Sequence, residues 1–426
     1  MSDFDLLIVG AGPAGCTLAL KLANKGLRIG IIEKDIFPRS KICGDALSGK
    51  ALNVLKRLPD GIYQDFIAGV EKTPSYGFRF IAPNHHLLDV PFFINYNKVA
   101  FQEYDGWVPL PPTFKEIAEP PGYICRRSVF DQFLFNKLSA YSDVKIIGGK
   151  RIRSAMINDD HVVIKTDDNE YTAKMVAGAD GVHSIIRKDL SLAIVEKRHF
   201  CLGIRGYFHN VANLHPKNFI ELIFLKPLLP GYFWIFPSTG GQVNAGFGMM
   251  QNQVLKRKVN LLRLFDDLIR NHPLLAPRFA NSTLIGKPEA HSLPMGTFNF
   301  NRSGNRFILL GDAAFLVDPF SGEGIGNAMA SGEIASSIIL DCWLKKDFSA
   351  DALNAYNIRI QKRFGQEFRT TAIMQKLARF PWLMNLVVDK AGKNRELRDL
   401  LTAMITKEEL KKKLTQPGFY AGLLFR

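Results

Sequence analysis

A glycine-rich loop near the start of the chain has the spacing of a phosphate-binding turn. It contains, in order, Gly10, Ala11, Gly12, Pro13, Ala14 and Gly15. Gly10 and Gly12 allow backbone amides to approach a pyrophosphate closely, and Gly15 permits tight packing of the helix that follows. The N-terminus of that helix adds partial positive charge. The loop therefore predicts a dinucleotide site, although a lone motif of this kind also marks ordinary turns.

An acidic residue stands where the adenosine ribose of such a dinucleotide is expected. Glu33 ends the second apolar strand of the chain, and a carboxylate at that place accepts hydrogen bonds from ribose hydroxyls. Lys34 follows it and is predicted to contact the same end of the cofactor. The strand, loop, helix and acid together favour nucleotide binding over a surface turn with an exposed glutamate.

A second glycine-rich segment lies near the other end of the chain. An apolar strand over 307–310 leads to Gly311 and Asp312, and a turn over 321–326 then opens another helix. Asp312 is placed to accept hydrogen bonds from ribitol hydroxyls, and the helix N-terminus can face the pyrimidine edge of a flavin. The residues of this segment predicted to contact the cofactor are Gly311, Asp312, Gly322, Gly324 and Ile325. Two such segments indicate one extended cofactor, FAD.

These residues require regular elements to position them. Apolar residues predict strands over 5–9 and 27–33, and helical spacing predicts a helix over 13–24 between them. This βαβ unit is followed by a predicted helix over 127–138, short strands up to 165 and a strand that ends near Gly181. A helix is also predicted near 253–271 and another from about 322 to 344.

The composition along the chain predicts interleaved domains. We expect a discontinuous FAD-binding domain over 1–75, 124–190 and 291–345. A mainly antiparallel β domain for the substrate is expected over 76–123 and 191–290, where aromatic residues and prolines are frequent. Residues 346–426 are expected to form a C-terminal helical region. The predicted fold class is therefore mixed α/β, with a Rossmann-like domain and an antiparallel substrate domain.

The charge and the cysteines restrict the class of protein. The chain has 55 basic and 40 acidic residues, a net charge of +15, but no charge run that would indicate nucleic acid. Solvated helix faces account for this excess, and contact of basic C-terminal helices with anionic lipid is the alternative. The five cysteines are widely spread without paired metal-ligand spacing, so neither a metal site nor a disulfide framework is predicted.

The termini and the apolar tracts predict a cytoplasmic protein, with contact at the inner face of the membrane as an option. Asp3 and Asp5 precede the first strand, where a secretory signal would have basic residues. The longest apolar tract, over 219–237, contains Glu221 and Lys226, which are costly across a bilayer. The apolar stretch over 380–388, flanked by Arg379 and Lys390, is expected either to enter a lipid headgroup layer or to pack on the protein.

Several motifs resemble the geranylgeranyl reductase branch of the FAD-dependent monooxygenase-like superfamily. Asp180 and Gly181 resemble its Asp-Gly motif, and Arg127 resembles its flavin-pyrophosphate arginine. Lys41, Cys43 and Gly44 resemble the K-x-C-G-[DG] loop beside the flavin in the reductases. A Y-x-W-x-F-P segment followed by G-x-G is similar to their signature, and it supplies Tyr232, Trp234, Phe236, Pro237, Gly246 and Gly248. The resemblance implies a p-hydroxybenzoate-hydroxylase-like fold, bound FAD and reduction of isoprenoid double bonds.

Cys43 and Tyr232 are the candidate catalytic residues. A thiol near Lys41 and backbone amides is expected to have unusual acidity, so Cys43 is a candidate acid or orienting group, with Tyr232 second. The alternative for Cys43 is a small packed side chain. Alternating aromatic side chains from Tyr232 to Phe236 offer a wall for a prenyl chain, whereas packing between sheet and flavin domain is the other interpretation.

Two further functions stay open at the level of sequence. The same fold supports FAD-dependent hydroxylation or halogenation of an aromatic substrate, and a flavin-bearing lipid or carrier-binding protein without turnover is a third class. The expected partners are a prenyl lipid or another apolar small molecule and a redox partner. No second dinucleotide motif is present for a stable NADPH domain, so ferredoxin and transiently bound NADPH both remain candidates for the electron donor.

Overall fold

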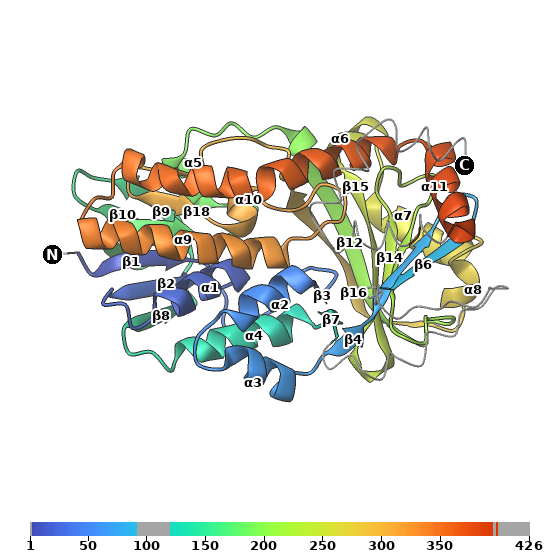
Figure 1. Cartoon of the computed structure of the whole chain (residues 1–426), viewed down its shortest axis with the longest axis horizontal. Coiled ribbons are helices and arrows are strands. Elements are labelled where there is room, and N and C mark those ends of the chain that lie inside the picture. The colour runs from blue at the N-terminus through green and yellow to red at the C-terminus, as the bar shows by residue number, and fades with distance from the viewer. Residues whose placement is uncertain (1, 92–119, 395–397, 399–426) are drawn as a thin grey trace.

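The computed structural model describes residues 2–91, 120–394 and 398. Two large β-sheets lie side by side along the long axis of the molecule, each covered by helices (Figure 1). The parallel sheet and its helices form the half that contains the N-terminus. The antiparallel sheet forms the other half, and the long helix α10 extends from the first half toward the second (Figure 1). The chain passes from one half to the other several times, and the two sheets therefore pack against each other.

The first sheet is mainly parallel. Its strand order is β17-β18-β11-β1-β2-β8, and a hairpin of β9 and β10 pairs with β11. The strands are β1 (Phe4–Val9), β2 (Ile29–Glu33), β8 (Val144–Gly148), β9 (Ile152–Ile157), β10 (Val162–Thr166), β11 (Glu170–Gly178), β17 (Ser303–Gly304) and β18 (Phe307–Leu309). Every residue of β1 and β2 is buried, as expected of parallel strands that are covered on both faces.

Helices from distant parts of the sequence surround this sheet. They are α1 (Pro13–Leu22), α2 (Gly49–Lys56), α3 (Ile62–Gly69), α4 (Arg127–Leu138), α5 (Ile185–Leu190), α9 (Ile325–Lys345) and α10 (Ala350–Leu377). Helix α9 packs on both α1 and α2, so the two glycine-rich segments of the chain are brought together. A small sheet of β3 (Ala46–Leu47), β7 (Gly122–Ile124) and β4 (Thr73–Ser75) adjoins them.

The second sheet is mainly antiparallel, with the strand order β16-β12-β15-β14-β13-β5-β6. The strands are β5 (Gly77–Ile81), β6 (Leu87–Pro91), β12 (Phe200–His209), β13 (Ile220–Ile223), β14 (Phe233–Pro237), β15 (Gln242–Met250) and β16 (Thr283–Pro294). Helices α6 (Gln251–Lys256), α7 (Leu261–Asn271), α8 (Ala276–Phe279) and α11 (Pro381–Lys393) pack around it. Phe233 and Ile235 point to the core beneath α7, so Trp234 and Phe236 point to the opposite face, toward the first sheet.

The predicted fold class is confirmed, because a parallel Rossmann-like sheet, a mainly antiparallel sheet and C-terminal helices are all present. The domain boundaries stay predictions; β16 continues to Pro294, beyond the boundary expected at 290. Residues 92–119, 395–397 and 399–426 of the predicted substrate and C-terminal regions lie outside the described residues.

The single helix predicted near 253–271 was wrong. The chain forms two helices there, α6 and α7, with a break between them. Lys258 in the break has a left-handed backbone (φ 52°), and the Asn260 side chain caps α7 by accepting a hydrogen bond from the Arg263 amide. These local backbone requirements override the helical spacing.

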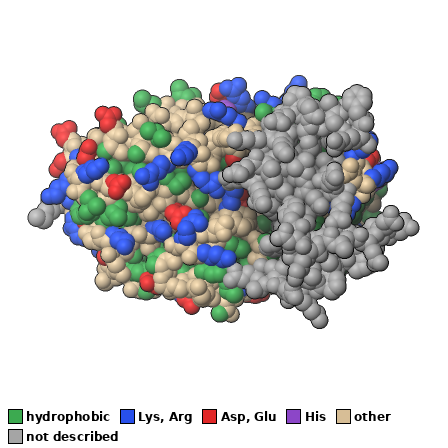
Figure 2. All heavy atoms as spheres, in the orientation of Figure 1, with side chains coloured by type: hydrophobic (Ala, Val, Ile, Leu, Met, Phe, Trp, Pro, Cys, Tyr) green, Lys and Arg blue, Asp and Glu red, His purple; other side chains and the backbone are tan. Residues whose placement is uncertain are grey.

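In the coloured part of Figure 2, the positive charge is not gathered in one patch. Basic and acidic side chains are interspersed over the half of this face that is described. Within the described ranges, no helix has both the length and the apolar character needed to cross a bilayer.

Candidate functional site

A cavity of about 1510 Å³ lies between the two sheets. Its lining combines the first glycine loop, the start of α2, the segment from Leu310 to Ile325 and the inner face of the antiparallel sheet. Pockets for single small ligands measure about 300–1,000 Å³. The cavity is therefore large enough for an extended dinucleotide together with a second molecule.

The glycine loop connects β1 to α1 at one end of this cavity. Gly10 has a left-handed backbone (φ 103°), and a Cβ atom there would lie 2.3 Å from the Ala179 carbonyl oxygen. A Cβ atom at Gly12 would meet only the Arg39 guanidinium, at 3.6 Å, so the space in front of α1 is open. Gly10, Gly12, Pro13 and Ala14 line the cavity. Gly15 lies behind it, because its Cβ position is 1.9 Å from the Gly10 carbonyl oxygen.

Glu33 is buried beside the loop and holds it in place. One carboxylate oxygen accepts a hydrogen bond from the Ala11 amide at 2.9 Å, and the other accepts from the Asp35 amide at 3.1 Å. Each oxygen keeps a further lone pair, so the predicted bond to a ribose hydroxyl stays compatible with these contacts. Lys34 lines the same end of the cavity and forms an ion pair with Asp35 at 3.1 Å.

Two guanidinium groups share one carboxylate at the pyrophosphate end. Arg127 donates two 2.7 Å hydrogen bonds to Asp131, and Arg39 contacts the same carboxylate at 2.9 Å. Arg39 also lies 3.8 Å from the Glu33 carboxylate, so two carboxylates balance the two guanidinium groups. The guanidinium N–H groups near the N-terminus of α1 are donors that suit a pyrophosphate. Arg127 was predicted from its motif, whereas Arg39, the guanidinium that faces Gly12, was not predicted. No motif marks Arg39.

Asp180, which is predicted to bind the cofactor, lies at the cavity and also caps α5 with its side chain. One of its carboxylate oxygens accepts hydrogen bonds from the Ile185 and Ile186 amides, at 2.8 and 3.2 Å. Burial raises the pKa of this carboxyl group. Asp180 and Gly181 both line the cavity, so they shape its wall, while the carboxylate is engaged with the helix.

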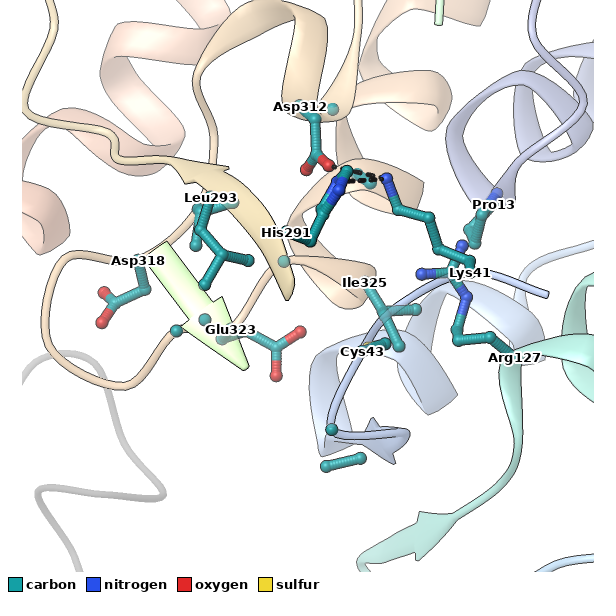
Figure 3. A pocket seen from close by; sticks show the side chains of 18 of the residues that line it. Pro13, Lys41, Cys43, Arg127, His291, Leu293, Asp312, Asp318, Glu323 and Ile325 are labelled. Atoms are coloured by element: carbon teal, nitrogen blue, oxygen red, sulfur yellow. Dashed lines mark hydrogen bonds and ion pairs between the residues drawn. The ribbon is translucent and has the colours of Figure 1, made fainter. Parts of the chain in front are cut away.

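A lysine, a histidine and an aspartate meet in the middle of the cavity. The Lys41 amine lies 3.0 Å from His291 Nε2 and 3.5 Å from the Asp312 carboxylate. Figure 3 shows this amine pointing to His291 and Asp312 and away from Cys43. Burial and the charge of Lys41 lower the pKa of His291 to about 4, so a neutral imidazole accepts from the amine. Sequence reasoning missed His291, which comes from β16 in the other sheet.

The turn over 318–324, which precedes α9, forms another part of the cavity lining. The Asp318 carboxylate accepts hydrogen bonds from the Phe320 and Ser321 amides, at 3.0 and 2.8 Å, and so holds the turn. Glu323 accepts from the Gly326 amide at 2.7 Å, and burial raises the pKa of its carboxyl group. Gly311, Asp312, Gly322, Gly324 and Ile325 all line the cavity. The positive end of the 21-residue helix α9 begins there.

The environment of Cys43 differs from the expectation. The acidity predicted for a thiol beside Lys41 was wrong, because burial raises the pKa of Cys43 above its ordinary value. The cation that opposes this rise is Arg127, since Lys41 is turned to Asp312. The loop is pressed against the second sheet, where a Cβ atom on Gly44 would lie 2.8 Å from the Phe236 ring. Cys43 therefore borders the cavity as a protonated thiol.

The aromatic segment forms part of the cavity wall. Tyr232, Trp234, Phe236 and Gly248 line the cavity, and the Tyr232 hydroxyl donates to the Ser321 carbonyl. Pro237 and Gly246 were predicted to line it but do not. Pro237 follows Phe236 on the strand and so points to the other face. A Cβ atom at Gly246 would lie 2.5 Å from the Trp234 ring, so this glycine makes room for the indole.

The residues present therefore fit FAD. Open space precedes a helix N-terminus, the Arg39 and Arg127 guanidinium groups lie beside it, and Asp312 and α9 lie further along the same cavity. Among the described residues, no group of three His, Cys, Asp or Glu side chains is close enough together to bind a metal ion.

Comparison with known proteins agrees with this geometry. A family model described as an FAD binding domain matches residues 3–205. A digeranylgeranylglycerophospholipid reductase of Thermoplasma volcanium is 28% identical over 389 residues, which cover 89% of this chain and 88% of that protein. A menaquinone reductase of Mycolicibacterium smegmatis is 26% identical over 88% of this chain and 85% of its own length.

Solved structures show the same fold. A geranylgeranyl bacteriochlorophyll reductase-like protein of Thermoplasma acidophilum superposes with a TM-score of 0.76 at 22% identity, covering 96% of this chain and 98% of its own. A halogenase solved with FAD has a TM-score of 0.71 at 16% identity, covering 99% and 89%. The fold is thus shared by reductases and halogenases. With the matching domain model, FAD is the cofactor of this chain.

Replacing Gly12 by valine should abolish FAD retention without unfolding the protein. The valine methyl groups have room in the cavity and would occupy the space in front of α1. The ratio of flavin absorbance to protein absorbance after purification measures this, with circular dichroism to show that the fold persists. Gly69→Ala on α3 is the control, because nothing lies within 4 Å of its Cβ position. A Gly12→Val protein that retains a full complement of FAD would contradict the assignment.

The pH dependence of stability should carry a contribution from His291. Its pKa is about 4 in the folded protein and about 6.5 in the unfolded chain, so only the unfolded chain takes up this proton in between. The stabilisation is thus complete above about pH 6.5 and is lost as the pH falls toward 4. His291→Gln keeps an acceptor for Lys41 but does not titrate, so its free energy of unfolding should fall less between about pH 7 and 5.

Urea denaturation across that pH range measures the difference between the two proteins. Parallel curves for the His291→Gln and unmodified proteins would refute the assigned neutral state.

Proposed function

We propose that this chain, an FAD-dependent oxidoreductase of the geranylgeranyl reductase-like kind, saturates isoprenoid double bonds of a lipid or another prenylated substrate. The relatives named above are reductases of a digeranylgeranyl phospholipid and of menaquinone. These substrates differ in head group, and both are prenyl lipids. A prenyl chain is therefore the substrate class that the comparisons support best.

The main support for the proposal is that a cofactor-binding surface and an apolar surface line the same cavity. The Cys43 loop and the cofactor-facing turns line one side, and the antiparallel sheet lines the other. The sheet contributes a mostly apolar wall, made by Phe78, Phe80, Ile220, Leu222, Tyr232, Trp234 and Phe236. Such a wall holds an apolar chain and excludes water.

Saturation of an alkene needs a hydride at one carbon and a proton at the other. FAD, when bound in its reduced form, would supply the hydride. The Cys43 thiol supplies the proton, because burial keeps it protonated at neutral pH. The S–H bond breaks as the new C–H bond forms, and the thiolate that remains lies near the Arg127 guanidinium, which stabilises it. Solvent then returns the proton to sulfur. An external donor, ferredoxin or NADPH, would supply the electrons for each turnover.

Tyr232 is the weaker candidate for the proton donor. Its hydroxyl already donates to the Ser321 carbonyl oxygen, and burial raises its pKa. It thus ties the antiparallel sheet to the turn before α9. We assign it to the wall of the site and Cys43 to proton transfer.

Entry of a lipid substrate would be served by the C-terminal helices. Phe380 and Trp382, at the start of α11, are 50% and 60% exposed. Arg379 precedes them and Lys390 follows on the same helix. Apolar side chains next to basic ones suit contact with the headgroups of anionic lipid.

An aromatic substrate is the second candidate, because halogenases share the fold. The apolar wall would accept an aromatic ring, and turnover would then require oxygen. A flavin-bearing protein that binds a lipid or carrier without turnover is the third class. Neither of these functions would add hydrogen to a prenyl substrate in the absence of oxygen.

An anaerobic experiment tests the proposed function. The photoreduced protein, mixed with geranylgeranyl lipids, should recover the absorbance of the oxidised cofactor, and mass spectrometry should detect hydrogen pairs added to the product. Lipids with phosphate and quinone head groups would separate the substrate types. Neither a gain of hydrogen nor recovery of absorbance with any of them would overturn the proposal. Product that forms only in air and gains oxygen would establish hydroxylation.

The proposed proton donor is tested by replacing Cys43 with alanine. The protein should retain FAD, and kcat should fall about 100-fold or more, since a positioned acid contributes that much. Cys201→Ala is the matched control, because this thiol on β12 also borders the cavity and burial raises its pKa to about 12. We expect a much smaller effect there. An unchanged kcat for Cys43→Ala would make Cys43 a packing residue.

A further inference from the structure

One buried amide links the proposed proton donor to the substrate wall. Asn244 lies on β15 and has no exposed surface. Its side-chain nitrogen donates to the Cys43 carbonyl oxygen and to the Asp45 carboxylate, each at 2.8 Å. Its side-chain oxygen accepts from the Trp234 indole at 3.0 Å. Both amide hydrogens and the oxygen are thus used: two contacts hold the loop over residues 43–45, and the third holds the Trp234 indole.

We propose that Asn244 and Asp45 are positioning residues. They fix the Cys43 thiol relative to the Trp234 side chain in the apolar wall of the cavity. The inference rests on the proposed function, in which Cys43 supplies the proton. Neither Asn244 nor Asp45 need touch the substrate; they act through the backbone of the Cys43 loop and through the indole of Trp234.

Asp45 is the anchor of the loop. Its backbone is left-handed (φ 67°), a conformation that aspartate tolerates better than most residues. Its carbonyl accepts from the Cys125 amide at 2.9 Å, and its carboxylate accepts from the Arg127 amide at 3.2 Å. Tyr207 on β12 donates to the same carboxylate at 2.5 Å. The residue that follows Cys43 and Gly44 is therefore fixed to both halves of the molecule.

The charges around Asp45 favour this anchoring role. Tyr207 lies between the guanidinium groups of Arg126 and Arg205, each 4.3 Å from its ring centre. Burial raises the pKa of Asp45, while the hydrogen bonds from Tyr207 and Asn244 and the charge of Arg205 oppose the rise. Each neighbour that contacts the carboxylate is a donor. Asp45 thus serves as an acceptor that holds these donors together.

The geometry of the wall makes the position of the loop sensitive to this network. Gly44 lies against the Phe236 ring with no room for a Cβ atom, and Gly246 likewise leaves room for the Trp234 ring. Phe236 and Asn244 are paired neighbours on β14 and β15, so the same face of the sheet both presses on the loop and holds it. Removing Asn244 leaves the Cys43 carbonyl, Asp45 and the indole short of a partner in a buried site. The loop should then move, and a shift of about 1 Å suffices to slow a reaction that depends on alignment.

The rate at which Cys43 is alkylated tests the proposal directly. The FAD-loaded protein is treated with iodoacetamide, and mass spectrometry of peptides follows Cys43, with Cys201 as an internal reference. Asn244→Ala should raise the rate at Cys43 relative to Cys201 by about tenfold. Trp234→Phe keeps a ring in the wall but removes the indole donor, so it should give a smaller rise in the same direction. Tyr207→Phe removes a donor to Asp45 without changing the charge of the site, and it should also raise the rate.

The control is Asn357→Ala, which removes a partly buried amide that bonds to Arg302 and Ser303 away from the cavity. It should lower the melting temperature and leave the labelling ratio unchanged. With a prenyl substrate, the network variants should lower kcat more than they change KM. Labelling at Cys43 that stays constant, or rises only in proportion to Cys201 in all three network variants, would overturn the inference. Because labelling needs no turnover, it decides the question even if reductase activity proves absent.

Discussion

The close contact between the first glycine loop and the end of β11 is the constraint on which the site depends. With no side chain at Gly10, the Ala179 carbonyl can approach to a distance that any Cβ atom would forbid. Gly15 allows α1 to fold back on the same loop. In both contacts, at Gly10 and at Gly15, backbone packs directly on backbone. The space next to Gly12 stays open. The absence of side chains at Gly10, Gly12 and Gly15 therefore leaves room for the cavity.

The second sheet completes the site because its inner face carries aromatic side chains that meet the Cys43 loop. Strand alternation sends Phe233 and Ile235 to a core under α7, and sends Trp234 and Phe236 to the cavity. Hydrogen bonds from Asn244 and Tyr207 to Asp45 then join the two halves at one loop. Apolar contacts set the distance between the two halves. The hydrogen bonds to Asp45 fix how the halves are positioned relative to each other.

The sequence was sufficient for those parts of the site that depend on backbone. Glycine spacing and apolar strands predicted the cofactor loops, because each such pattern has a local cause. Side chains that cross between the halves could not be predicted in this way. Arg39 and His291 carry no motif, and the partners of Glu33 and Asp180 depend on where distant backbone amides lie. Pro237 and Gly246 match a signature, yet strand alternation and ring packing remove them from the cavity wall.

The protonation state of Cys43 shows why the three-dimensional environment decides the chemistry. Sequence placed Lys41 two residues away and suggested an acidic thiol, but the amine turns to Asp312 and His291. Burial then dominates and keeps the proton on sulfur, while Arg127 stands close enough to stabilise the thiolate once the proton has left. A donor needs both properties, since it must hold its proton before the reaction and tolerate its loss afterwards. The Cys43 loop therefore provides the protonated thiol, and the start of α4 provides the guanidinium that favours its deprotonated form.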